Sequence, residues 1–254
     1  MPRDIQKISL VIPAYNEERR LPASLHKMLV HFKNVPYELE VLAMIEKSKD
    51  RTVEVSKEVV KSDLRFQIVD NKVQRGKGYA VRSGMNRATG DVVIFMDADL
   101  STPLEEVDSF VKYFNENPLV DVVIGSRAHA KSQIVKSQHP LRKNMGRIFN
   151  KFVQLLAGEG ITDTQCGFKA FRREACVEIF SRQKLDGFAF DVEVLMLARL
   201  LGFKIDVLPV KWVNDEDSKV RIVRDSLKML RDLIKTRWLV ARSLREKPPV
   251  PRLK

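Results

Sequence analysis

Short apolar runs alternate with segments of helical spacing through the first half of the chain. The strand-like runs are 8–12, 40–45, 66–69 and 92–96. Apolar residues recur every three or four positions in 21–32, 52–60 and 79–88. Strands that alternate with helices favour right-handed β-α-β units, so we expect an α/β fold with a mostly parallel, doubly wound sheet flanked by helices. In such a sheet, ligands bind beyond the carboxyl ends of the strands.

The second half of the chain has a less regular pattern. Residues 126–147 are polar and basic without a clear period, which predicts a loop. The remaining expected elements are a strand at 119–125, a helix at 148–156, a loop with strand character at 162–172, a helix at 191–201 and a late strand at 207–213. An amphipathic helix is expected at 223–244. We therefore expect one α/β domain over residues 1–221 and a basic amphipathic helix and tail over 222–254.

Composition limits the class of protein. The chain has 254 residues, 44% of them hydrophobic and 31% charged, which is typical of a folded globular domain and excludes a disordered chain. No apolar run approaches the ~20 residues that span a bilayer, and the first residues lead into a strand rather than a signal peptide. Two cysteines, Cys166 and Cys176, are too few for a disulfide framework, so a reducing cytosol is the expected compartment.

The positive charge is concentrated near the end of the chain. The formal net charge is +12, and residues 220–254 hold 11 Lys or Arg against three acids, or 11 − 3 = +8. A basic amphipathic helix suits the surface of an anionic membrane. The alternative is a helix that docks on the domain with a solvated basic face. A basic chain also suits nucleic acid, but no nucleic-acid-binding motif is present and aromatic residues are sparse.

Two acids follow the apolar run 92–96 directly, in Asp97-Ala98-Asp99. Carboxylates at the carboxyl end of a strand suit a Mg²⁺ or Mn²⁺ ion that also holds substrate phosphates. The alternative is that these acids cap the helix that follows. Ser101 or Thr102 is better placed for that capping, so we favour the metal site.

A glycine-rich turn, Arg75-Gly76-Lys77-Gly78, stands at the entry to the helix expected at 79–88. Glycines let the backbone approach a phosphate, a helix N-terminus favours an anion, and Lys77 adds a positive charge. Such turns are common, and this one lacks the spacing and the Ser or Thr of a P-loop. The paired acids after the neighbouring strand strengthen the phosphate interpretation.

These elements, with further motifs in the later half, resemble glycosyltransferase family 2, which has the GT-A fold and uses nucleotide-diphosphate sugars. The motifs that carry the resemblance are Val11-Ile12-Pro13-Ala14-Tyr15-Asn16-Glu17, Gly76-Lys77-Gly78, Asp97-Ala98-Asp99, Asp163-Thr164-Gln165-Cys166-Gly167-Phe168-Lys169, Phe190-Asp191-Val192-Glu193 and Pro209-Val210-Lys211-Trp212. The later motifs look like the dolichyl-phosphate β-glucosyltransferase branch, and the dolichyl-phosphate mannose synthases are similar but more distant. The resemblance covers roughly residues 5–235.

The resemblance implies a role for each matching residue. The nucleotide sugar would be contacted by Pro13, Tyr15, Glu17, Gly76, Lys77 and Asp97. The metal ligands would be Asp99, as the principal one, and Asp97. Acceptor or donor phosphates would be bound by Arg127, Arg142 and Arg147. The acceptor and sugar side would be lined by Asp163, Gln165 and Lys169, and many family members place a catalytic base where Asp191 and Glu193 stand.

The turn after the second strand departs from the family pattern. The family usually has Asp-Asp-Gly-Ser there, whereas this chain has Ile45-Glu46-Lys47-Ser48. An isoleucine cannot accept a hydrogen bond from the base, so either Glu46 substitutes or backbone groups hold the base. A solvated loop acid is the third interpretation of Glu46. The identity of the donor is therefore left open between UDP-glucose and GDP-mannose.

The class of acceptor decides what catalysis requires. A hydroxyl acceptor needs a general base, whereas a phosphate monoester is already anionic and needs positive charge to dock. Arginines at 127, 142 and 147 suit a phosphate, although they are also compatible with a solvated basic loop. The resemblance therefore predicts an inverting, metal-dependent transfer of a hexose, with UDP-glucose as the leading donor and dolichyl or another polyprenyl phosphate as the acceptor. A saccharide acceptor is the alternative, and the expected location is the cytosolic face of a membrane.

Overall fold

The computed structural model describes residues 5–136, 161, 163–213 and 222–246. Its strands are β1 (Lys7–Ala14), β2 (Glu38–Glu46), β3 (Phe66–Asn71), β4 (Val92–Met96), β5 (Val122–Ser126), β6 (Gln133–Lys136), β7 (Phe168–Arg172), β8 (Ile205–Pro209) and β9 (Lys211–Val213). Its helices are α1 (Arg20–His31), α2 (Thr52–Val60), α3 (Lys77–Arg87), α4 (Glu105–Glu116), α6 (Arg173–Phe180), α7 (Phe190–Leu200) and α8 (Ile222–Glu246), with a short 3₁₀ turn at Phe32–Asn34.

The main sheet of the described chain has the strand order β3-β2-β1-β4-β7-β5-β8. Strands β1 to β4 pair in parallel, and β7 runs antiparallel between β4 and β5. The predicted α/β fold with a mostly parallel sheet is confirmed. Because β7 is reversed, its first residues lie at the edge where the parallel strands end, so the chain just before Phe168 is brought next to the end of β4.

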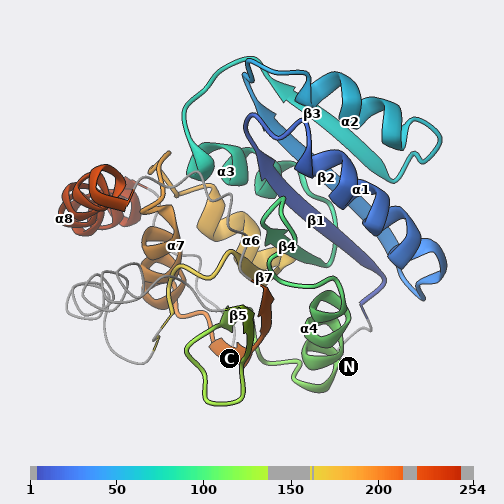
Figure 1. Cartoon of the computed structure of the whole chain (residues 1–254). Coiled ribbons are helices and arrows are strands. Elements are labelled where there is room, and N and C mark those ends of the chain that lie inside the picture. The colour runs from blue at the N-terminus through green and yellow to red at the C-terminus, as the bar shows by residue number, and fades with distance from the viewer. Residues whose placement is uncertain (1–4, 137–160, 162, 214–221, 247–254) are drawn as a thin grey trace.

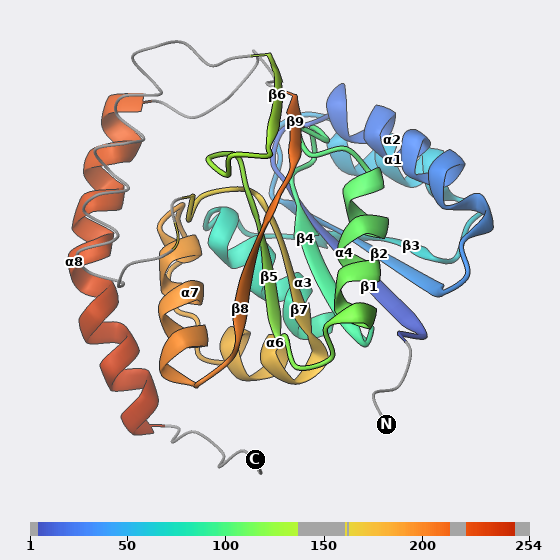
Figure 2. The same ribbon diagram turned by 90° about the horizontal axis from the view of Figure 1, so that it is seen from below.

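Apolar side chains fill both faces of the sheet. Successive residues of a strand point to opposite faces, so a strand buried on both sides is apolar at nearly every position. In β1, Val11 packs against the layer that contains α3, α6 and α7, while Leu10 and Ile12 pack against α1 and α4. Figure 1 shows β1, β2 and β3 as neighbouring strands, and Figure 2 shows the helix layers on either side of the sheet with α8 beyond α7.

The structure differs from the predicted elements in several places. The segment predicted to be a loop contains β6, which pairs with β9 in a separate two-stranded ribbon. The predicted late strand is divided into β8 and β9, and α6 follows β7 without having been predicted. The predicted cap of the fourth helix by Ser101 or Thr102 is wrong, because α4 begins at Glu105 without a side-chain cap. The helix predicted at 148–156 lies outside the described residues.

Candidate active site

The carboxyl ends of β1 and β2 are joined by hydrogen bonds between the turns that follow them. The amide of Asn16 donates to Ser48 Oγ at 3.0 Å, and the amide of Lys49 donates to Asn16 Oδ1 at 2.8 Å. Asn16 has a left-handed backbone with φ of 53°, a conformation that asparagine tolerates better than most residues. The turns after β1 and β2 are therefore hydrogen-bonded to each other beside the end of β4.

The turn after β4 contains the predicted metal ligands in a strained conformation. Leu100 has φ of 53°, which costs a residue other than glycine about 1–2 kcal/mol. The amide of Leu100 donates to the carbonyl of Asp97 at 3.2 Å, and the amide of Ser101 donates to Asp99 Oδ1 at 2.9 Å. The first bond closes the backbone turn after Asp97 and the second holds the Asp99 carboxylate. Backbone strain of this kind clusters at functional sites.

Lys77, the first residue of α3, lies against this turn. Its Nζ is 2.6 Å from Asp97 Oδ1. Burial opposes the charge on Lys77, but the negative charges of Asp97, Asp191 and Asp99 outweigh it and raise the pKa of Lys77. Burial, and then the charge of Asp97, raises the pKa of Asp99. The site thus has one ammonium ion for two adjacent carboxylates, and Asp99 is the less well neutralised of the two.

Residues just before and within β7 complete the surroundings of Asp97. A Cβ on Gly167 would overlap the Asp97 carboxylate, so only glycine fits there without displacing that side chain. Two positions further, Lys169 is fully buried and donates to the Cys166 carbonyl at 2.7 Å and to Asp191 Oδ1 at 2.5 Å. Burial raises the pKa of Asp191, and the charge of Lys169 opposes that shift. In this structure the Lys169 ammonium is bound by Asp191, and the predicted role of Lys169 on the acceptor side stays a prediction.

Arg127 follows β5 and is also paired with an acid. Its Nε and Nη2 donate to the two carboxylate oxygens of Asp163, both at 2.7 Å, and its guanidinium stacks on Trp212. Burial opposes the charge on each side chain of this pair, but their attraction prevails, lowering the pKa of Asp163 and raising that of Arg127. Arg142 and Arg147, the two other arginines predicted to bind phosphate, lie outside the described residues.

Glu46 is only 3% exposed, so the interpretation as a solvated loop acid is wrong. Its Oε1 accepts hydrogen bonds from the amides of Arg75 and Gly76, at 2.8 and 2.7 Å. The Glu46 carboxylate, at the end of β2, therefore fixes the backbone of the glycine-rich turn. Gly76 has φ of 128°, so the turn needs glycine at this position for conformational reasons as well.

The other residues predicted to contact the nucleotide sugar lie on β1 and the turn after it. Pro13 is buried within β1, and Tyr15 is partly buried after its end. The carboxylate of Glu17 is bound by Arg20 through Nε at 2.6 Å and Nη2 at 2.7 Å. Gln165 is partly buried between Asp163 and Gly167. Pro13, Tyr15 and Glu17 thus lie where β1 ends, at the carboxyl edge of the sheet. Their contact with the nucleotide sugar and the acceptor-side role of Gln165 stay predictions.

Comparison with protein families identifies the family of this chain. Residues 9–180 match the family described as Glycosyl transferase family 2. This chain belongs to that family. As a family 2 member it is a glycosyltransferase, as the sequence motifs predicted.

Curated relatives of this family 2 glycosyltransferase match most of its length. It is 37% identical over 240 residues to dolichyl-phosphate beta-glucosyltransferase ALG5A of Trichomonas vaginalis, covering 90% of this chain and 72% of that one. It is 32% identical over 242 residues to the dolichyl-phosphate beta-glucosyltransferase of Homo sapiens, covering 90% and 74%. The predicted branch of the family is therefore the one to which these relatives belong.

Solved structures support the fold of this glycosyltransferase. Glucosyl-3-phosphoglycerate synthase from Mycobacterium tuberculosis, in complex with Mn²⁺, UDP and phosphoglyceric acid, matches with a TM-score of 0.68 at 20% identity, covering 94% of this chain and 78% of that one. Mannosyl-3-phosphoglycerate synthase from Rubrobacter xylanophilus matches with a TM-score of 0.65 at 17% identity, covering 98% and 77%. At these identities the likeness confirms the GT-A-like fold alone.

The carboxylates of this glycosyltransferase fit a divalent cation whose remaining coordination positions are filled by substrate and water. Within the described residues, no three His, Cys, Asp or Glu side chains gather around a point where a metal would sit. Mg²⁺ commonly uses only one or two carboxylates, with the remaining positions taken by water and substrate phosphates. Asp97 and Asp99 meet that requirement. Burial and the neighbouring charge of Asp97 raise the pKa of Asp99, so its ionised form is destabilised and a bound cation would favour it.

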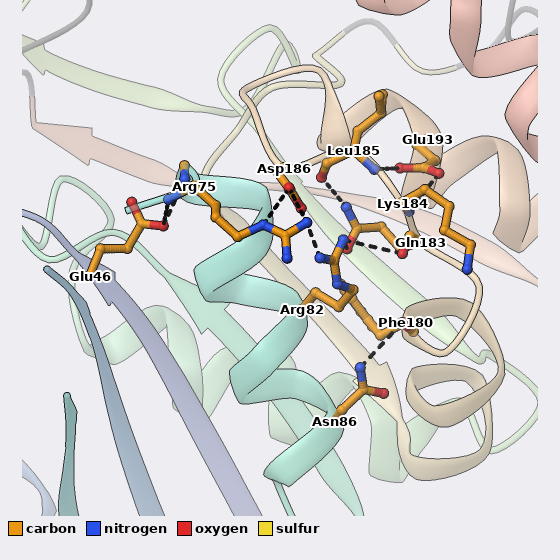
Figure 3. Close-up of polar contacts among 11 residues, drawn as sticks. Glu46, Arg75, Arg82, Asn86, Phe180, Gln183, Lys184, Leu185, Asp186 and Glu193 are labelled. Carbon is orange, nitrogen blue, oxygen red and sulfur yellow. Dashed lines mark hydrogen bonds and ion pairs between the residues drawn. The ribbon is translucent and has the colours of Figure 1, made fainter. Parts of the chain in front are cut away.

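Arg82 and Asp186 were not predicted from the sequence, whereas Glu193 was predicted as a candidate catalytic base. Figure 3 shows Arg82 and Asp186 in a polar network that joins α3 to the loop before α7. Glu193, one of the two acids that stand where many family members place a base, accepts hydrogen bonds from the amides of Lys184 and Leu185, both at 2.8 Å. Its carboxylate therefore shapes that loop. No short sequence motif marks Asp186, because its partners on α3 lie more than one hundred residues earlier.

Proposed function

We propose that this glycosyltransferase transfers glucose from UDP-glucose to dolichyl or another polyprenyl phosphate with inversion of configuration. The curated relatives, named as dolichyl-phosphate beta-glucosyltransferases, support the acceptor and the sugar. The structural neighbour in complex with UDP and Mn²⁺ supports the nucleotide and the metal. Family membership also favours an enzyme over the nucleic-acid-binding alternative.

The observation that carries this proposal is the state of Asp191. A general base needs a carboxylate that can reach the acceptor and take its proton. Asp191 is instead 4% exposed and bound to the ammonium of Lys169, which suits a structural and electrostatic role. An acceptor that is already an anion needs no base, so a phosphate monoester fits this site better than a saccharide hydroxyl does.

The reaction is a single displacement. A phosphate oxygen of the acceptor attacks the anomeric carbon, and the bond between that carbon and the β-phosphate oxygen breaks. Its electron pair leaves with UDP, and no proton is transferred. Attack from the face opposite the leaving group inverts the configuration.

Charge stabilisation is the catalytic requirement of this step. A divalent cation held by Asp97 and Asp99 would offset the negative charge that grows on the leaving diphosphate. Lys77 lies beside the same carboxylates and contributes a fixed positive charge to the donor side. Arg127 is the described arginine beside the acceptor side, with Asp163 holding its guanidinium in place.

The contacts of Glu46 bear on how the donor base is bound. The Glu46 carboxylate is engaged by the amides of Arg75 and Gly76, which supports recognition of the base by backbone groups rather than by this side chain. GDP-mannose therefore remains the competing donor. A panel of donors distinguishes the two.

Membrane association would bring the enzyme to its lipid acceptor from the cytosolic side. None of the helices in the described part of the chain is both long and apolar enough to cross a membrane. On α8, Val240 and Ser243 are buried against the domain, while Trp238 is 61% exposed beside exposed arginines. We infer that the helix both docks on the domain and presents a basic face to anionic lipid.

The test is a donor panel with the full chain. The protein is incubated with dolichyl phosphate in detergent, Mg²⁺ or Mn²⁺, and radiolabelled UDP-glucose, UDP-galactose or GDP-mannose, and organic-extractable label is counted. We expect product with UDP-glucose, its loss with EDTA, and its loss in Asp99→Asn at unchanged thermal stability. Product with GDP-mannose alone would replace the donor, and full activity of Asp99→Asn would contradict the metal site.

A further inference from the structure

The loop between α6 and α7 lies across the first turn of α3. Figure 3 shows the contact: Asp186 of the loop faces Arg75, two residues before α3, and Arg82, within α3. Asp186 Oδ2 accepts from Arg75 Nε at 2.8 Å, and Asp186 Oδ1 accepts from Arg82 Nη2 at 2.8 Å. Both guanidiniums also stack on the ring of Tyr79, at 4.7 and 5.4 Å from its centroid.

Two glycines show how closely the loop and the turn approach. A Cβ on Gly76 would lie 2.6 Å from the carbonyl oxygen of Asp186, and a Cβ on Gly78 would overlap the carbonyl oxygen of Leu185. The amide of Tyr79 donates to the same Asp186 carbonyl at 3.3 Å. The glycine-rich turn is thus in backbone contact with the loop, and this contact explains both glycines without a ligand.

The loop itself has a defined shape. Glu193 accepts from the amides of Lys184 and Leu185, and the side chain of Gln183 donates to the carbonyl of Leu185. Arg82 Nη1 contacts the carbonyl of Gln183 at 3.3 Å. These hydrogen bonds hold the backbone of the loop, so the Asp186 carboxylate is directed toward α3.

The turn is therefore held from two directions. Glu46 binds the backbone amides of the turn from the end of β2, and Asp186 binds Arg75 of the turn and Arg82 of α3 from the loop before α7. The residue between the two glycines is Lys77, whose Nζ reaches Asp97. Any shift of the turn would move this ammonium relative to the predicted metal ligands.

We propose that Asp186 is a positioning residue. It acts through Arg75 and Arg82 to fix the glycine-rich turn, and with it Lys77, against Asp97. The proposal rests on the proposed function, because it takes the turn to be part of the nucleotide-diphosphate site. The Asp186 side chain is 25% exposed and its carboxylate is occupied by two arginines. Asp186 therefore acts by geometry and charge rather than by contact with the reacting atoms.

The experiment measures UDP binding in the presence of Mn²⁺ by calorimetry and the KM and kcat for the donor. We expect Asp186→Asn to weaken UDP binding and to raise the donor KM about tenfold, in line with the loss of a charge-assisted contact, with kcat at saturating donor changed less than threefold. In an Arg75→Gln, Arg82→Gln background, the same substitution should have no further effect.

A matched control separates positioning from general destabilisation. Asp63 and Arg65 form a comparable ion pair at 2.7 Å between α2 and β3, away from the site. Asp63→Asn should leave UDP binding unchanged at a similar loss of thermal stability. Wild-type protein that fails to bind UDP overturns the proposed function and this assignment with it. Wild-type binding that Asp186→Asn leaves unaltered, or an undiminished effect of that substitution in the double-arginine background, overturns the assignment alone.

Discussion

Side chains around the active site are fixed mainly by other parts of the same chain. Gly167 leaves room for Asp97, Lys169 neutralises Asp191, and Asp163 holds Arg127. Each of these contacts joins residues from different strands or loops. Single substitutions at these positions should therefore show which contacts serve activity and which serve the stability of the fold.

Gly167→Ala should lower kcat/KM for the donor by about 100-fold, because the new methyl group overlaps the Asp97 carboxylate and a displacement of about 1 Å has that effect on catalysis. Steady-state kinetics at saturating acceptor measure the change. The control is Gly202→Ala, where φ of +76° makes alanine strained but no atom lies within 4 Å of the added carbon. That variant should lose stability and keep its activity; equal kinetic losses in both variants would contradict the steric explanation.

Lys169→Met should destabilise the fold by about 3–5 kcal/mol near neutral pH, because it leaves the buried Asp191 without its cation. Urea denaturation measures the loss. The pKa of Asp191 is already raised by burial, so the penalty should shrink as the pH falls and the carboxyl becomes protonated. The double variant Lys169→Met, Asp191→Leu should recover most of the stability. A double variant as unstable as Lys169→Met would show that the ion pair is not the cause.

The sequence predicts the acids better than their partners. Asp97 and Asp99 stand directly after a wholly apolar run, so their place at the sheet edge follows from the strand alone. The role of Glu46 was not predictable, since a glutamate in a turn has the same local pattern whether solvent or two backbone amides bind it. Asp186 was missed because its partners belong to a helix that only the tertiary fold brings near.

At the scale of elements, segments with a clear hydrophobic pattern were predicted closely, and the shortest strands were not. The amphipathic helix predicted at 223–244 is α8, Ile222–Glu246, and the strand predicted at 92–96 is β4. Strands β6 and β9 span only four and three residues, too few for a period to be recognised. They are defined by pairing with each other across a long sequence separation.

The position of α8 predicts which of its residues would contact lipid in the proposed membrane association. Its Val240 side is occupied by the domain, so contact with lipid falls to exposed Arg231, Lys235, Trp238 and Arg242. Binding to vesicles with anionic lipid should then be electrostatic, with about 1 kcal/mol for each basic residue near the surface, and should weaken as salt increases. Co-sedimentation measures it.

Charge reversal at Arg231, Lys235 and Arg242 should abolish this binding. The matched control reverses three exposed lysines on the opposite side of the sheet, namely Lys27, Lys33 and Lys57. Equal binding by both triple variants would mean that overall charge, rather than α8, attracts the protein to the membrane.

The whole molecule distributes ionisable groups of opposite pH behaviour across its interior. Arg127 lowers the pKa of Asp163 below its ordinary value of 3.8, so the folded state binds fewer protons there than the unfolded chain. The stabilisation from this pair is present above that ordinary pKa and is lost as the pH falls through the depressed one. Asp191 and Glu193, whose pKa values are raised by burial, act in the opposite sense.

Asp163→Asn should therefore flatten the loss of stability in acid. The free energy of unfolding of the wild type should decline between about pH 5 and pH 3, and that of the variant should decline less over the same interval, from a lower starting value at pH 7. Urea titrations at several pH values measure both curves. Parallel curves would mean that other groups govern the acid sensitivity.

The antiparallel strand β7 has a consequence for the order in which the sheet can be completed as the chain is made. Strands β4 and β5 are not neighbours, and β7 joins them although it follows both in the sequence. Until Arg172 has left the ribosome, β4 has one unpaired edge that is apolar at every position, and β5 has no place in the sheet. Open strand edges of this kind recruit other chains. A nascent or truncated chain that stops before Phe168 therefore carries an aggregation-prone edge that the complete protein covers with its own later sequence.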